Sequence, residues 1–268
     1  MIKKFLAFVM FVLLTLATSA AFSVEKFEEV LKKAEKGDAM AQHALGVMYY
    51  SGDGVKQDYS EAAKWFKKAA GQGAAGSQFN LGLMYYNGDG VKQNYSEAVK
   101  WWRKAAEQGD MEAQHYLGIV YGLGNGVKQN YSEAVKWWRK AAQNGHDDAQ
   151  YNLAISYERG LGVKKDDKEA VKWYLKAAEN GNADAQYNLG NSYVEGDIVK
   201  QDYAEALKWW LKAAEQNHSQ AQYNIGVLYY KGTGVEQDDN EAVKWWRKAA
   251  QNGHEEAQKI LTQLGETW

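Results

Sequence analysis

The chain repeats itself every 36 residues, and this period constrains its fold more than any other feature. The stretch AAGSQFNLGLMYYNGDGVKQNYSEAVKWWRKAAEQG, Ala74 to Gly109, returns in five more related copies without a gap, and the six copies fill residues 38–253. A fixed period of this length is typical of one supersecondary unit stacked on itself. The 268 residues therefore predict an elongated repeat array rather than one or two ordinary globular domains.

Each copy predicts two helices joined by a glycine turn. In the third copy, apolar residues recur at helical spacing over 111–121, and the paired glycines Gly124 and Gly126 then supply a turn. Asn130, with Glu133 three residues later, indicates a capping box at the start of a second helix that reaches Gln143. The same pairing of Asp or Asn with Glu occurs in all six copies, so we expect twelve helices from the repeats.

Glycine recurs in the middle of the first helix, although it costs about 1 kcal/mol there relative to alanine. Its recurrence predicts a close crossing with a neighbouring helix that a Cβ atom would obstruct. The second helix carries a stripe of tryptophans beside alanines, and we expect the indoles to fill the space between helices. Ala154 takes the glycine position in the fourth copy, and the glycines of the other copies are Gly46, Gly82, Gly118, Gly190 and Gly226.

Residues 1–23 resemble a secretory signal peptide. Lys3 and Lys4 form a basic head, an apolar run follows from Phe5 to Leu16, and small residues before Phe22 suit cleavage. The run is shorter than the roughly 20 residues that span a bilayer, which disfavours a membrane anchor. We therefore expect a periplasmic or secreted protein with no membrane span after signal removal.

Composition narrows the classes of partner. The chain has no cysteine, so the exported form would depend on packing rather than on disulfides. Loss of Lys3 and Lys4 lowers the 32 basic residues to 30 against 34 acidic ones, a net charge of −4. This balance disfavours nucleic acid as the main partner. We expect a monomer without a cofactor.

The signature positions A-x-A-Q-Y-x-L-G-x-x-Y-x-x-G-x-G-V and E-A-x-K-W-x-x-K-A-A-x-x-G recur through residues 38–253. In these positions the sequence resembles the sel-one-like repeat family, which is related to tetratricopeptide repeats. The resemblance implies an all-α fold: a right-handed α/α solenoid of six 36-residue helix-turn-helix repeats, with half-repeat capping helices at 24–37 and 254–268. Members of the family mostly act as scaffolds that bind proteins, and some cysteine-rich secreted members are described as β-lactamases or penicillin binders.

The residues that could support enzymatic chemistry are few. A cell-wall-directed hydrolase or β-lactamase-like enzyme is the alternative to a scaffold, but Ser-x-x-Lys occurs only at Ser23 to Lys26, and Lys-Thr-Gly and Ser-Asp-Asn are missing. The five histidines lie one or more repeats apart, so we predict solvated positions and no metal site. We name no catalytic residue. A lysine stripe on the second helices, such as Lys64 and Lys68, fits a solvated face whose stems cover aromatic rings.

The candidate binding surface lies on the first helices, where residues vary between otherwise similar copies. Tyrosine and asparagine there suit recognition of a protein or peptide, because amides donate and accept hydrogen bonds and tyrosine supplies apolar area. The alternative, that these aromatic residues merely complete the core between repeats, stays open. By analogy with related solenoids we place partner binding on the concave face. The candidate residues are Asn80, Asn152, Asn188, Asn224, Tyr50, Tyr86 and Tyr230.

Overall fold

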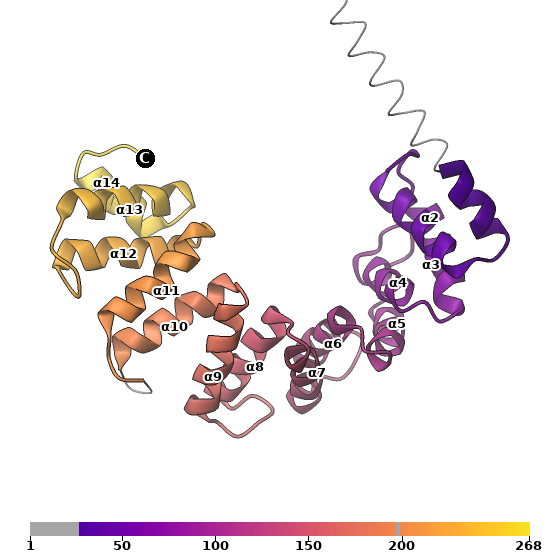
Figure 1. The fold of residues 1–268 in the computed structure, drawn as a ribbon, viewed down its shortest axis with the longest axis horizontal. Helices are drawn as coiled ribbons and strands as arrows, with labels where there is room; N and C mark the ends of the chain where they lie inside the picture. Colours follow the sequence, from indigo (N-terminus) through magenta and orange to yellow (C-terminus); the bar gives the residue numbers. More distant parts are fainter. Residues whose placement is uncertain (1–26, 197–198) are drawn as a thin grey trace, which may run out of the picture. The chain divides into compact units, whose positions relative to one another are not determined.

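A computed structural model describes residues 27–196 and 199–268, and Figure 1 shows the order of its helices. The predicted signal peptide and Ile198, a departure from the usual loop glycine, lie outside these residues. The described residues contain helices and turns but no strand, so the fold is all-α as predicted. They fall into two compact units, which divide the chain between Gln129 and Asn130.

Unit 1 holds a helix over 27–35 and five further helices. The first helices of successive repeats carry even numbers and the second helices carry odd numbers. Within single repeats, α2 packs against α3 and α4 packs against α5, and α3 and α5 also pack against the first helix that follows them. The five are α2 (Ala39–Ser51), α3 (Tyr59–Gly71), α4 (Ala75–Asn87), α5 (Tyr95–Glu107) and α6 (Met111–Leu123).

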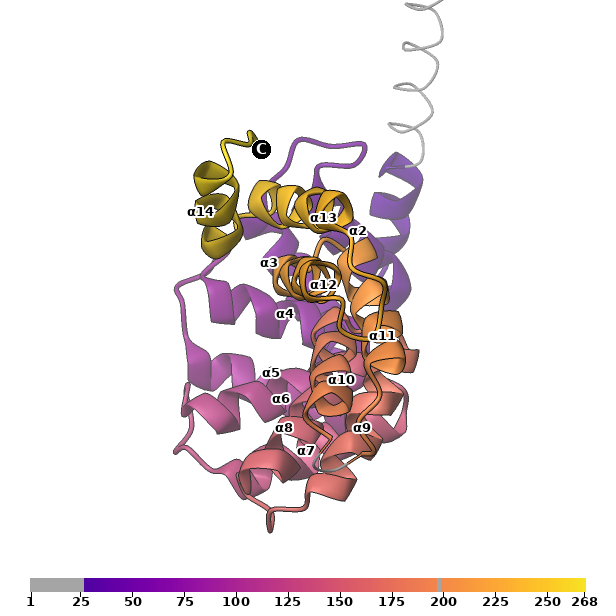
Figure 2. The same cartoon turned by 90° about the vertical axis from the view of Figure 1, so that its left-hand side faces the viewer.

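Unit 2 continues the alternation with eight helices and ends on a shorter one. Figure 2 allows α12, α13 and α14 to be followed at this end, where α13 packs against both of the others. The eight are α7 (Tyr131–Gln143), α8 (Asp147–Arg159), α9 (Asp167–Glu179), α10 (Ala183–Glu195), α11 (Tyr203–Glu215), α12 (Ser219–Lys231), α13 (Asp239–Gln251) and α14 (Glu255–Gln263).

Half of the predicted capping box forms. The Asn94 side chain accepts a hydrogen bond from the Glu97 backbone N–H at 3.1 Å, and the corresponding Asp or Asn caps every other second helix. The reciprocal bond from glutamate is replaced, because the Asn94 N–H already donates to the Tyr85 carbonyl at 2.8 Å. The Glu97 carboxylate instead pairs with Lys100, three residues further along the helix.

The glycines inside the first helices make room for aromatic rings, as predicted. A Cβ atom on Gly190 would lie 2.4 Å from the Trp210 ring, and one on Gly82 would lie 2.5 Å from Trp102. The ring that excludes a side chain belongs to the second helix of the same repeat. In the fourth repeat Ala154 is accommodated, and the partner ring there is the smaller Tyr174 of the same buried cluster.

The segments outside the six repeats pack on their neighbours. Phe27 and Leu31 contact the buried cluster of Leu45 and Trp65, and Leu261 of α14 joins the cluster around Trp246. Asn217, which replaces a terminal glycine, adopts the left-handed conformation with φ 64°, as its small polar side chain allows. Within 27–196 and 199–268, every helix is too short or too polar to cross a membrane.

Candidate functional site

The seven candidate residues occupy two equivalent positions of the first helices. The asparagines are the sixth residue of α4, α8, α10 and α12, and the tyrosines are the twelfth residue of α2, α4 and α12. Three pockets lie between successive first helices, and each is lined by the same five positions of the repeat. Two positions belong to the earlier first helix, two belong to the later first helix, and the fifth is an aromatic residue of the second helix between them. We call them pockets A, B and C.

Pocket A lies in unit 1 between α2 and α4 and has a volume of about 180 Å³. Tyr50 and Val47 line it from α2, Asn80 and Leu83 from α4, and Phe66 from α3. Burial is the main cause that raises the pKa of Tyr50 above its usual value, and the negative charge of Asp89 adds to it. The Tyr50 hydroxyl therefore stays protonated at neutral pH. The structure therefore joins two predicted residues from neighbouring repeats in one apolar hollow.

Pockets B and C are neighbours in unit 2, each with a volume of about 360 Å³. Asn224 and Val227 of α12 line pocket B, with Trp210 as the aromatic residue. Tyr230 lines pocket C, with Trp246 in the equivalent place. The remaining lining residues of pocket B are Asn191, Val194, Glu195, Tyr203, Leu228, Lys231 and Thr233, and those of pocket C are Tyr223, Val227, Lys231, Ile260, Gln263 and Leu264.

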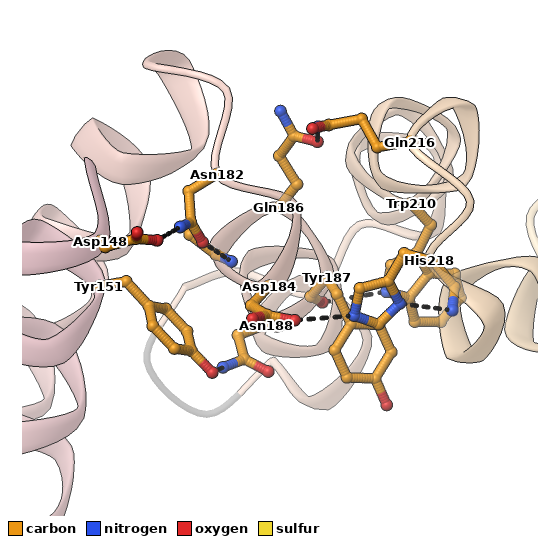
Figure 3. A network of polar contacts seen from close by, with 12 residues as sticks. Asp148, Tyr151, Asn182, Asp184, Gln186, Tyr187, Asn188, Trp210, Gln216 and His218 are labelled. Carbon is orange, nitrogen blue, oxygen red and sulfur yellow. Dashed lines mark hydrogen bonds and ion pairs between the residues drawn. The ribbon is translucent and has the colours of Figure 1, made fainter. Parts of the chain in front are cut away.

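Three candidates line none of these pockets. Tyr86 packs 5.4 Å from Trp102, and Tyr116, which takes the asparagine position in the third repeat, lies 5.0 Å from the same ring. The Asn188 amide donates to the Tyr151 hydroxyl at 3.5 Å, as Figure 3 shows. Asn152 is partly buried in α8. A tyrosine at the asparagine position thus packs against the aromatic ring whose equivalents line pockets A to C.

A hydrogen bond between two side chains of the fourth repeat, Tyr174 and Glu158, lies near Asn188 of the fifth repeat. The Tyr174 hydroxyl donates to the Glu158 carboxylate at 3.2 Å. Burial is the main cause that raises the pKa of Tyr174, and the Glu158 charge adds to it. Burial also raises the pKa of Tyr151. Both tyrosines therefore remain neutral hydrogen-bonding groups at physiological pH, without the lowered pKa that an activated nucleophile requires.

The prediction of solvated histidines is wrong. His115 and His146 are buried, and His146, His218 and His254 cap first helices through Nδ1, which accepts a backbone N–H. Histidine is outside the usual set of capping residues, so the sequence pattern did not indicate this role. The His218 ring also stacks on Tyr187 and places Nε2 3.2 Å from Asp184 of the preceding repeat, as Figure 3 shows.

Sequence reasoning also missed the role of the glutamine that recurs every 36 residues. Gln78 donates to the Ala70 carbonyl at 3.1 Å and accepts from the Gln108 amide at 2.8 Å. In unit 2, Gln186 bonds Ala178 and the Gln216 amide in the same way. These buried amides link one repeat to the next, so their recurrence reflects stability rather than ligand binding.

The lysines of the stripe make two kinds of contact, ion pairs with glutamate and cation–π contacts with tryptophan. Lys64 pairs with Glu61, and Lys68 lies 3.6 Å from the centroid of the Trp65 ring. The equivalent lysine lies over the equivalent tryptophan in the other five repeats, at 4.0–4.7 Å. These lysines are exposed, as predicted for a solvated face, but it is the Nζ atom rather than the stem that the contacts place over each ring.

One group of side chains has metal-ligand composition. His146, Asp147 and Asp148 each place one atom within 4.8 Å of the others at the start of α8. However, His146 Nδ1 accepts the Ala149 N–H, and Asp148 accepts the Asn182 amide at 2.8 Å. The positive end of the helix dipole also disfavours a cation at this place. His146 therefore caps α8, and Asp148 bonds the following repeat.

Comparisons with known proteins agree with the repeat period. The Sel1 repeat model matches six segments: residues 39–73, 75–110, 112–146, 147–182, 183–218 and 219–254. A Sel1 repeat protein from Oxalobacter formigenes is 37% identical, with a TM-score of 0.75, over 85% of this chain and 99% of that one. No functionally curated protein matched.

A second solved structure is a protective antigen of uropathogenic Escherichia coli strains with the same type of repeat. It is 38% identical, with a TM-score of 0.81. The match covers 90% of this chain but 53% of the antigen, so the chain spans about half of that protein's length.

Proposed function

The chain belongs to the Sel1 repeat family, and on this premise we propose that it is an exported scaffold that binds an extended segment of a protein partner along its first helices. The observation that carries the proposal is that the same type of pocket recurs between successive first helices. Pockets A, B and C use the same five repeat positions, although their side chains differ. Repetition at a fixed spacing suits a ligand that is itself a repeating chain.

The chemistry of the pockets favours peptide. Each pocket places an aromatic ring beside aliphatic side chains, which suits an apolar side chain of the partner. Asn80 in pocket A and Asn224 in pocket B add amides. An amide both donates and accepts, so it matches the N–H and C=O groups of a peptide backbone. We propose that binding uses this pocket-lined side of the first helices, and the expectation that it is the concave side belongs to the same proposal.

Sel1 repeats commonly serve as protein-interaction scaffolds, which favours the scaffold over the enzyme. The cell-wall hydrolase considered as an alternative would need a nucleophile with a base beside it. The tyrosines near Asn188 have raised pKa values, and the histidines of unit 2 cap helices. No pocket observation favours the enzyme over the scaffold.

Export is the second part of the proposal, and its support is the basic head and apolar run before Phe22. Mass spectrometry of the protein purified from its natural host should find an N-terminus at Ala21, Phe22 or Val24. An intact Met1 in the cytoplasmic fraction would overturn export and leave the binding proposal to be judged separately.

Peptide binding is tested by selecting peptides from a random display library against residues 24–268. We expect recovered peptides to bind wild type and to lose at least about tenfold in affinity to Asn224→Tyr, because the bulky ring would occupy pocket B. The native Tyr116 shows that a first helix accepts tyrosine at this position. Glu215→Ala, an exposed change on α11, is the matched control.

Thermal melting by circular dichroism should show that both variants keep the fold. Selected peptides that bind wild type, Asn224→Tyr and an equivalent Asn80→Tyr variant equally well would place recognition outside the pockets. Failure to recover any binding peptide would contradict the proposal as a whole.

A further inference from the structure

Pocket C differs from pockets A and B in one of its walls. Ile260, Gln263 and Leu264 line it from the C-terminal end of α14, and the facing wall comes from α12. α14 has nine residues, of which Ala257 and Leu261 are buried, whereas α12 has thirteen residues, of which five are buried. Elements with few buried contacts open locally at a lower free-energy cost than the rest of a protein. α14, which Figure 2 shows beside α13, is therefore the wall of pocket C that can detach.

His254 ties the first turn of α14 to α12. Its Nδ1 atom accepts the Ala257 backbone N–H at 3.3 Å, so the proton of the neutral ring resides on Nε2. Nε2 lies 3.0 Å from the Gln220 side-chain oxygen of α12, which accepts a hydrogen bond from it. The ring also stacks on Tyr223 of α12, with centroids 4.4 Å apart and planes at 10°. Tyr223 itself lines pocket C, so the contacts that dock α14 reach the pocket.

Protonation of His254 opposes these contacts. A proton on Nδ1 replaces the acceptor by a second donor that faces the Ala257 N–H. The positive end of the α14 dipole also disfavours a cation at this place. Burial lowers the pKa of His254 because it penalises the charged ring, and the charge of Glu256 offsets this effect only in part. The neutral ring is therefore the form that keeps α14 docked.

The contacts of His254 with the neighbouring helices involve uncharged groups. α12 presents the Gln220 amide and the Tyr223 ring, and burial raises the pKa of Tyr223, so that hydroxyl stays neutral. α13 presents the Ala249 carbonyl, which accepts the His254 backbone N–H at 2.9 Å. The basic side chains of α13 contact other groups: Lys244 pairs with Glu241, Arg247 pairs with Glu266, and Lys248 lies over Trp245. On α14 itself Glu255 is exposed and Glu256 pairs with Lys259, which leaves Glu256 as the charge that acts on His254.

His218 makes the equivalent contacts one repeat earlier but differs in two respects. It caps α12 and stacks on Tyr187, yet its Nε2 lies 3.2 Å from the Asp184 carboxylate, which can pair with a protonated ring. α12 also packs against both α11 and α13, whereas α14 packs mainly against α13. Because Gln220 takes the place of Asp184, the docking of α14 is the more acid-sensitive of the two.

We infer that pocket C is under pH control through His254. The neutral ring docks α14 and completes the pocket, whereas a proton on the ring weakens docking and shifts α14 toward a released form that lacks this wall. The inference adds regulation to the proposed function and rests on it for the ligand alone. The released chain binds the proton more readily, so docking is at full strength above about pH 6.5 and weakens as pH falls below that value.

Hydrogen–deuterium exchange of the protein tests the effect, with uptake corrected for the influence of pH on intrinsic exchange. Protection of the α14 amides should fall between pH 7.5 and 5.5 by at least about twofold and at most about tenfold, because a released histidine with a pKa of about 6.5 titrates about one unit above the lower pH. Protection of the α12 amides should fall less, since the capping His218 faces Asp184.

Two variants assign the effect to His254. His254→Asn keeps a capping side chain that does not titrate, so protection of α14 should be the same at both pH values. Gln220→Glu places a carboxylate opposite Nε2, as Asp184 does for His218, so it should reduce the pH effect. An undiminished pH effect in either variant, or equal protection of wild-type α14 at both pH values, would overturn the inference. If His254→Asn leaves α14 unprotected at pH 7.5, Gln220→Glu decides alone.

A bound peptide separates this inference from the proposed function. A library-selected peptide that Tyr230→Ala weakens is a ligand of pocket C. Such a peptide binds the docked form, so a saturating amount should restore the protection of α14 at pH 5.5, whereas a peptide weakened only by Asn80→Tyr, in pocket A, should not. If protection depends on pH as described and no selected peptide restores it, the inference stands and peptide binding in pocket C fails. If peptides raise a protection that is independent of pH, the proposed function stands and the inference fails.

Discussion

At the scale of single residues, the array is held by pairs of positions that must fit each other. Gly190 and Trp210 form one such pair, because a Cβ atom on Gly190 would lie within 2.4 Å of the indole. The indole N–H also donates to the Tyr187 carbonyl at 3.1 Å, which fixes the ring over the helix. The pairing of Ala154 with Tyr174 in the fourth repeat is consistent with the same constraint.

Gly190→Ala should therefore lower the free energy of unfolding by about 1–3 kcal/mol, the usual cost of overpacking, despite the better helix propensity of alanine. Gly71→Ala is the control, because a Cβ there meets nothing within 4 Å. It should be neutral or stabilise by up to about 1 kcal/mol. Urea denaturation checks both, and a Gly190→Ala variant as stable as Gly71→Ala would refute the close contact.

A second prediction at this scale concerns pH. Burial lowers the pKa of His254 below its ordinary value, against a smaller opposing effect of Glu256. The unfolded chain therefore binds the proton more readily than the folded chain. The His254 contribution to stability should be complete above about pH 6.5 and should be lost as pH falls below that value.

Urea denaturation at pH 7.5 and 5.5 measures this loss. Protonation also removes the Nδ1 acceptor that caps α14. His254→Asn keeps a capping side chain without a titrating ring, so it should lose less stability between the two pH values than wild type. An equal loss in both proteins would show that His254 is not the group responsible.

At the scale of helices, the sequence predicted most of what the structure shows. Helix positions, side-chain caps and mid-helix glycines follow from local rules, since each depends on residues a few positions apart. The roles of Gln78 and His218 could not be predicted, because Gln78 bonds Ala70 and His218 faces Asp184, and both partners lie in the preceding repeat. For the candidate site, the 36-residue period was enough to select Tyr50 and Asn80 as candidates in neighbouring repeats, and both line pocket A. It could not show that Asn188 bonds Tyr151, since that contact depends on a tyrosine placed 37 residues earlier.

The tryptophan stripe provides the prediction at this scale. Trp173 of α9 is 8% exposed and belongs to the largest buried cluster of unit 2, whereas Trp137 in the third repeat is only partly buried. Trp173→Ala should cost about 3–5 kcal/mol of unfolding free energy, the usual range for a buried tryptophan. Lys168→Ala, on an exposed position of the same helix, should change stability by about 0.5 kcal/mol or less. Equal losses in chemical denaturation would mean that α9 buries a different face.

At the scale of the whole molecule, one packing rule produces both stability and a binding surface. The second helices supply buried aromatic rings, the first helices supply the glycines that admit those rings, and three of the rings lie at the base of pockets between neighbouring first helices. Pocket chemistry then depends on two variable positions of each first helix. Substitution at these positions can change the ligand without disturbing the glycines, glutamines and caps that hold the array.

The account's central claim is that a peptide lies in the pockets between first helices, and nuclear magnetic resonance tests it most directly. A protein labelled with ¹⁵N would be titrated with the tightest peptide selected from the library. The largest shifts should fall on the Trp210 and Trp246 indoles, the Asn224 side-chain amide and the Val227 backbone. Shifts confined to the loops around Gly126 and Gly162, with those four signals unmoved, would contradict the claim.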